Sequence, residues 1–81
     1  MTNTALLESK IRESGLKDGF LAKSCGISER TFYNKKKGKN AFNQYEILVL
    51  KTVLRLSETD IDMIFFAVSV DKPSTEEDDY A

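Results

Sequence analysis

Hydrophobic residues recur along residues 4–70 at spacings of three and four, in short stretches that glycines and polar residues interrupt. This spacing places apolar side chains on one side of a helix. In the first stretch, Leu7 and Ile11 are one helical turn apart, and Gly15 follows as a natural terminator. The pattern predicts five helices, over residues 4–14, 18–24, 29–37, 44–55 and 58–70.

Three of the predicted helix starts carry capping residues. Ser28 precedes the helix 29–37, and its hydroxyl can accept a hydrogen bond from the first turn. Asn43 followed by Glu46 resembles a capping box, and Ser57 followed by Asp60 repeats the arrangement. No strand pattern competes with these helices, although residues 66–70 also fit a short extended segment.

The chain is therefore predicted to be all-α, with one domain over residues 1–70 and a tail over residues 71–81. Its 81 residues suit a single small domain, and 41% apolar with 31% charged residues is a globular balance. Pro73 prevents the last helix from continuing. The residues that follow are polar and acidic, so we expect the tail to be disordered.

The composition argues against an enzyme, a metalloprotein and a membrane protein. The absence of histidine removes the commonest metal ligand and general base. The single cysteine, Cys25, cannot form an intramolecular disulfide and is expected to be an inert buried side chain. The longest apolar run, residues 64–68, is far shorter than the roughly 20 residues that span a membrane, and no secretory signal is visible. We expect a cytoplasmic protein without catalytic activity, metal or cofactor.

The net charge of −1 is unevenly distributed along the chain. Residues 1–56 contain eleven Lys/Arg against five Asp/Glu (+6), whereas residues 57–81 contain one Lys against eight acids (−7). Residues 17–39 alone contain seven basic residues and two acids (+5). A local basic surface is typical of nucleic-acid binding. The acidic tail is open to three interpretations: a solubilising end, a competitor of DNA phosphates for nearby lysines, or a contact site for a protein partner.

Three residues with distinct steric roles indicate a helix-turn-helix. Ala22 provides a small side chain where two helices cross closely, and Gly26 tolerates the positive φ that the turn requires. Phe32 then buries the second helix against the first. Many helical hairpins satisfy this triplet, so the residues around it decide the interpretation.

Together with its flanking residues, the triplet resembles the helix-turn-helix of the Cro and lambda-repressor family, also called XRE-like regulators. The resemblance covers about residues 5–67 and is carried by Gly15-Leu16, Leu21-Ala22, Cys25-Gly26-Ile27-Ser28, Thr31-Phe32, Gly38-Lys39, Phe42, Glu46-Ile47 and Leu50. The segment 54–66 is similar to small regulators of phages of Gram-positive bacteria. The resemblance implies a compact five-helix lambda-repressor-like domain that binds double-stranded DNA.

The predicted helix 29–37 carries the candidate DNA contacts. The resemblance implies that its outward face reads bases through Glu29, Arg30, Tyr33 and Asn34. It also implies phosphate contacts from Ser28, Lys36, Lys37, Lys39 and Asn40. Arginine can pair with guanine, asparagine with adenine, and glutamate can accept from the cytosine amino group. Two simpler interpretations remain: the lysines as a solvated helix end, and Tyr33 as cover for apolar surface.

Two places depart from the family pattern. Asp18 stands where the family often has glutamine, and an acid there cannot make the usual phosphate or bracing contact, although it can cap the helix. Lys35 and Lys36 stand where an aliphatic residue is frequent. Lys35 falls on the inward side of the helix, so its stem is expected to lie along apolar surface with the ammonium in water. The helix 29–37 would then be held mainly by Phe32 and only loosely anchored.

The last predicted helix, 58–70, is apolar on two faces. One face, formed by Ile61, Ile64, Phe65 and Val68, can pack on the core. The opposite face is a candidate homodimer interface and is formed by Met63, Phe66, Ala67 and Val70. The alternatives are a helix threaded centrally through the domain, or a bend after Phe66.

The sequence therefore predicts a dimeric, sequence-specific transcriptional regulator, a phage or mobile-element repressor that occludes a promoter at an inverted-repeat operator. The alternative is a protein-interaction module on the same fold, such as an antitoxin or antirepressor. That module would use the second face of the last helix and residues 71–81. Binding through phosphates weakens steeply with salt, whereas a packed apolar interface does not.

Overall fold

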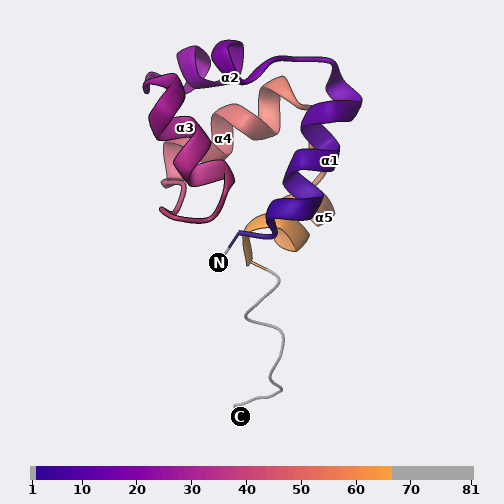
Figure 1. Cartoon of the computed structure of the whole chain (residues 1–81). Coiled ribbons are helices and arrows are strands. Elements are labelled where there is room, and N and C mark those ends of the chain that lie inside the picture. Colours follow the sequence, from indigo (N-terminus) through magenta and orange to yellow (C-terminus); the bar gives the residue numbers. More distant parts are fainter. Residues whose placement is uncertain (1, 67–81) are drawn as a thin grey trace.

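Five helices account for most of residues 2–66, the part of the chain that the computed structural model describes (Figure 1). They are α1 (Thr4–Ser14), α2 (Asp18–Cys25), α3 (Glu29–Lys36), α4 (Gln44–Val53) and α5 (Glu58–Ile61), and a π-helical segment, η1 (Asp62–Phe66), continues α5. No strand occurs within residues 2–66, which confirms the predicted all-α class. The predicted tail, residues 71–81, lies outside the described residues.

The predicted helix caps are confirmed. Ser28 Oγ accepts a hydrogen bond from the first turn of α3. Both capping boxes are present, Asn43 with Glu46 and Ser57 with Asp60. In each box the cap side chain accepts from a backbone N–H at 2.8 or 3.0 Å, and the carboxylate accepts from the N–H of the cap at 3.0 Å. These reciprocal bonds satisfy backbone donors that a helix start would otherwise leave unpaired.

The sequence predicts a continuous α-helix over residues 58–70, and the structure differs from this prediction. The segment is α-helical only as far as Ile61, and the wider π-turns of η1 follow; residues 67–70 lie outside the described part of the chain. Within η1, the carbonyl of Ile64 accepts a hydrogen bond from the N–H of Asn3 at 2.6 Å. That bond ties the start of α1 to η1.

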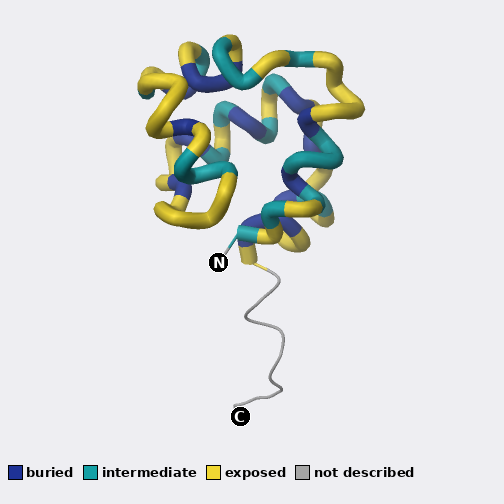
Figure 2. Tube along the Cα trace, viewed as in Figure 1, coloured by how far each residue is buried: buried dark blue, intermediate teal, exposed yellow. Residues whose placement is uncertain are grey.

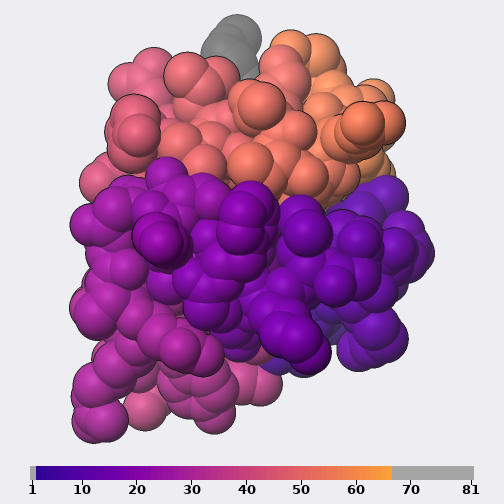
Figure 3. Space-filling view, turned by 90° about the horizontal axis from the view of Figure 1, so that it is seen from above, coloured from indigo at the N-terminus to yellow at the C-terminus, as the bar shows by residue number. Residues whose placement is uncertain are grey.

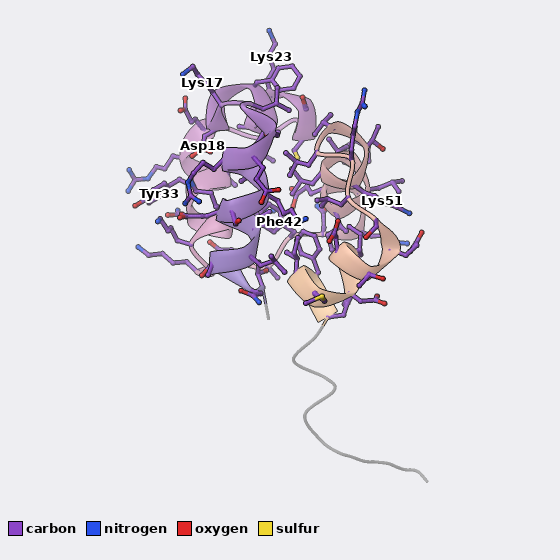
Figure 4. The ribbon with its side chains drawn as sticks, turned by 90° about the vertical axis from the view of Figure 1, so that its right-hand side faces the viewer. Lys17, Asp18, Lys23, Tyr33, Phe42 and Lys51 are labelled. Carbon is purple, nitrogen blue, oxygen red and sulfur yellow. The ribbon has the colours of Figure 1, made fainter. Side chains whose placement is uncertain are left out.

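The helices pack in two halves around one apolar core. The half formed by α1, α2 and α3 lies against the half formed by α4, α5 and η1 (Figure 3), and the buried positions face inward (Figure 2). Phe42 lies between the halves (Figure 4), with its ring edge-to-face against Phe32 at 5.9 Å and Phe65 at 5.7 Å. The most deeply buried side chains are Phe32, Leu7, Leu21, Leu50 and Ile64.

The end of α4 contains an arginine in a backbone conformation that favours glycine. Arg55 has φ +57°, and the next residue, Leu56, donates its N–H to the carbonyl of Lys51 at 2.9 Å. This is the Schellman arrangement, which reverses the chain after the helix and returns Leu56 to the core. A non-glycine residue in this region costs about 1–2 kcal/mol.

Replacing Arg55 by glycine should therefore stabilise the domain. We expect Arg55→Gly to raise the free energy of unfolding by about 0.5–1 kcal/mol, because relief of the positive φ exceeds the extra chain entropy of glycine. Urea unfolding of Arg55→Gly and Arg55→Ala measures the effect. The alanine variant keeps the backbone penalty, so an equal gain in both variants would attribute the effect to loss of the arginine side chain.

Candidate nucleic-acid interface

Helices α2 and α3 are joined by the tight turn that the sequence predicts at Gly26. Ala22 is buried where α2 meets α3, and Phe32 is fully buried on the inner face of α3. Gly26 has φ +76°, and the N–H of Ile27 donates to the carbonyl of Ala22 at 3.1 Å. A Cβ at position 26 would be strained by this φ alone. The turn directs α3 steeply away from α2 (Figure 1).

Consecutive lysines at the end of α3 form ion pairs with three different helices. Successive residues of a helix point about 100° apart, so three neighbours can reach three different elements. Lys35 reaches Glu46 of α4, Lys36 reaches Asp18 of α2, and Lys37 reaches Glu8 of α1. The expectation of a loosely anchored α3 is therefore wrong, because ion pairs reinforce the packing of Phe32.

The pair between Lys35 and Glu46 is the most buried of the three. The Lys35 ammonium donates to both carboxylate oxygens of Glu46, at 2.6 and 2.8 Å, and only 2% of Glu46 is exposed. The same carboxylate caps the N–H of Asn43. The predicted course of Lys35, with its ammonium in water, is also wrong: the buried carboxylate draws the ammonium inward.

Asp18 has a different role from the one its position suggested. The N-cap of α2 is Lys17, and the start of α2 has no side-chain cap. The Asp18 carboxylate instead accepts from the ammonium of Lys36 at 2.6 Å. Asp18 therefore joins the first turn of α2 to the last turn of α3 through an ion pair, a contact that the sequence did not predict.

The predicted base-reading residues lie together on α3, with different degrees of exposure. Glu29, Arg30 and Tyr33 are exposed, and Asn34 is half-buried. The Glu29 carboxylate lies beside Gly19, with one oxygen 3.5 Å from where a Cβ on Gly19 would be. The Tyr33 ring has the ammonium groups of Lys36 and Lys37 at 5.8 and 5.6 Å from its centre, a cation–π distance.

The predicted phosphate contacts are more scattered. Ser28 is exposed, with its hydroxyl bonded to Thr31, and Lys39 and Asn40 are exposed in the loop after α3. Lys36 is only 13% exposed at its side chain, whereas Lys37 is 40% exposed. Both lysines have carboxylate partners within the domain. Lys39 makes no ion pair with any residue of the described part of the chain.

Lys17 is a candidate phosphate contact that the sequence analysis missed. It is exposed and precedes α2, and it lies on the same side of the molecule as Tyr33, remote from Lys51 (Figure 4). The signal in the sequence was its place immediately before the first residue of the motif helix. The acidic partners of the α3 lysines, Glu8 and Asp18, were missed as well.

The described residues include only part of the candidate dimer face. Ile61, Ile64 and Phe65 are buried, whereas Met63 and Phe66 are half exposed, so the predicted division of this segment into two faces is confirmed for residues 61–66. Ala67, Val68 and Val70 lie outside the described residues. Beside this face, α4 exposes further apolar side chains, and an open groove of about 530 Å³ runs between the two elements, lined in part by Ile47, Leu48, Ile61 and Phe66.

Comparison of the chain with protein-family models finds no match, and comparisons with curated proteins and with solved structures find none either. Within residues 2–66, no helix is long and apolar enough to cross a membrane. The same residues bring together no group of three His, Cys, Asp or Glu side chains that could hold a metal ion. Burial raises the pKa of the Cys25 thiol, which disfavours the reactive thiolate.

Breaking the buried pair at Glu46 should loosen the whole motif. Glu46→Gln keeps an oxygen for the N–H of Asn43 but leaves Lys35 without a charged partner in a partly buried place. We expect a loss of about 1–3 kcal/mol in the free energy of unfolding, measured by urea unfolding. The matched control is Glu58→Gln, which removes the exposed partner of Lys51. Equal, small effects of the two substitutions would show that the Glu46 pair does not anchor α3.

Proposed function

We propose that the protein is a sequence-specific DNA-binding transcriptional regulator of the lambda-repressor-like type. The observation that carries the proposal is the helix-turn-helix from α2 to α3, whose second helix is tied to α4 and α2 by two part-buried lysine pairs and exposes a polar, basic outer face. A helix with such a face suits the major groove, which admits one α-helix.

The distribution of positive charge supports the same proposal. Four basic residues of this region, Lys17, Lys23, Arg30 and Lys39, make no ion pair with any residue within the described range 2–66. Cations that the fold leaves available can neutralise phosphates, and phosphate contacts supply most of the affinity of non-specific DNA binding.

In this proposal the exposed face of α3 discriminates between bases. Arg30 offers two parallel donors to the O6 and N7 atoms of guanine, and Asn34 offers a donor and an acceptor to adenine. Glu29 can accept from the amino group of cytosine. Ser28, Lys37, Lys39 and Asn40 then contact phosphates and fix the position of α3 along the groove. Lys36 would first have to leave Asp18.

The regulatory part of the proposal is a repressor of phage or mobile-element origin, without catalytic activity, that occludes a promoter as a homodimer. The dimer face would include Met63, and two-fold symmetry then requires an inverted-repeat operator. The second candidate is a protein-interaction module, favoured by the apolar side chains that α4 and η1 expose, among them Tyr45, Leu48 and Met63. DNA affinity that falls steeply between about 50 and 200 mM salt separates the regulator from that module.

Substitutions on α3 and in the following loop should have distinguishable effects. Arg30→Ala or Asn34→Ala should cost about 1–3 kcal/mol on the preferred site and relax the preference at one base pair. Lys39→Ala should weaken all duplexes alike and lower the slope of log affinity against log salt by about one. The preferred site comes from selection of bound duplexes out of a random library.

These variants serve as controls for one another. Fluorescence anisotropy measures the affinity of each for the selected site and for a shuffled site. If Arg30→Ala bound both duplexes as tightly as the wild type, the base-reading face would be assigned wrongly. If no duplex were selected at any salt concentration, the protein-interaction module would replace the regulator.

A charge on the exposed face of η1 should prevent the proposed dimer. Met63→Asp is expected to give a folded monomer that binds the inverted repeat much more weakly, because an aspartate cannot be buried without a partner. Sedimentation and circular dichroism measure association and folding. Thr59→Asp, on the exposed surface of α5, is the control for an added charge. A wild type that stays monomeric both free and on DNA would contradict the dimer.

A further inference from the structure

Two adjacent lysines at the end of α3 hold carboxylates in different ways. Lys36 belongs to the last turn of α3, is 13% exposed, and lies 2.6 Å from Asp18, while a second carboxylate, Glu8, is 3.9 Å away. Lys37 is the C-cap residue just beyond the helix, is 40% exposed, and lies 2.8 Å from Glu8. The first ammonium is enclosed between elements, and the second faces solvent.

The surroundings of Lys36 suit an ion pair that persists when a ligand binds. Its partner Asp18 sits in the first turn of α2, where a carboxylate also interacts favourably with the positive end of the helix dipole. The pair joins the two helices of the motif and is largely shielded from water. A phosphate could reach this ammonium only after Lys36 had left Asp18.

The surroundings of Lys37 suit an exchangeable contact. Its ammonium lies 5.6 Å from the centre of the Tyr33 ring, on the exposed face of α3. The hydrogen bond from Lys37 lowers the pKa of Glu8, so Glu8 is ionised at neutral pH. Exposed ion pairs are individually weak, so a phosphate can replace Glu8 at little cost.

We infer that Glu8 is an internal competitor of DNA: it occupies the Lys37 ammonium in the free protein and yields it to a backbone phosphate on binding, while Asp18 keeps Lys36 as a tie within the motif. This inference rests on the proposed DNA-binding function. The competition lowers the affinity that the Lys37–phosphate contact contributes on any duplex, whereas contacts to bases are unaffected. Glu8 therefore lowers affinity for random DNA without lowering the preference among bases.

The test compares five variants, one of them a double variant, with the wild type on a pool of fluorescent random-sequence duplexes at about 50 mM salt. Glu8→Gln should bind about two- to fivefold more tightly than the wild type, the range expected for loss of one exposed competing pair. Glu13→Gln makes the same charge change on α1 at a carboxylate bonded to Ser9, and should bind like the wild type or slightly more tightly. In a Lys37→Gln background, Glu8→Gln should give no gain. Asp18→Asn should instead lower the melting temperature and weaken binding.

Each alternative outcome has a distinct meaning. Equal tightening by Glu8→Gln and Glu13→Gln, or a gain that persists with Lys37→Gln, would overturn the inference and leave the proposed function intact. A wild type that binds no duplex would overturn the proposed function. The pair itself can be measured without DNA, because NMR titration of Glu8 should give a higher pKa in Lys37→Gln than in the wild type, and an unchanged pKa would contradict the pairing. Melting temperatures of the Glu8 and Lys37 variants should match the wild type, so altered binding cannot reflect unfolding.

Discussion

The buried carboxylate of Glu46 is the constraint on which the arrangement of the helices depends. An ionised group taken out of water must find compensating partners, and Glu46 has two kinds: the N–H of Asn43 and the ammonium of Lys35. The first bond starts α4, and the second fixes the end of α3 against that start. One side chain therefore caps the start of α4 and holds the end of the candidate recognition helix against it.

The two other lysine pairs extend this constraint to the rest of the N-terminal half. Lys36 joins α3 to α2 and Lys37 joins α3 to α1, while the inner face of α3 is filled by Phe32. What remains exposed on α3 is the outer face with Arg30 and Tyr33. The contacts that position the helix thus leave this outer face as the part that can meet a ligand. They also occupy Lys36 and Lys37, two cations that composition alone would count as available for phosphates.

The two candidate surfaces of the molecule are connected through the start of α1. The N–H of Asn3 is bonded to Ile64 of η1, and the methyl group of Thr4 lies 3.3 Å from where a Cβ on Gly38 would be, in the loop after α3. The start of α1 therefore lies against both the element with the candidate dimer face and the loop with Lys39. In the proposed regulator, this packing would hold the two α3 helices of a dimer at a defined spacing.

The sequence by itself determined the local features: the first four helices, the caps at Ser28, Asn43 and Ser57, the turn at Gly26 and the inward position of Phe32. Each depends on residues within a few positions of one another, so spacing and backbone preference suffice to predict it. Only the tertiary structure decided the partners of Lys35, Lys36 and Lys37, which are 11, 18 and 29 residues away in the chain. Their choice among several carboxylates depends on the angles at which helices cross, and those angles arise from packing of the whole core rather than from local sequence.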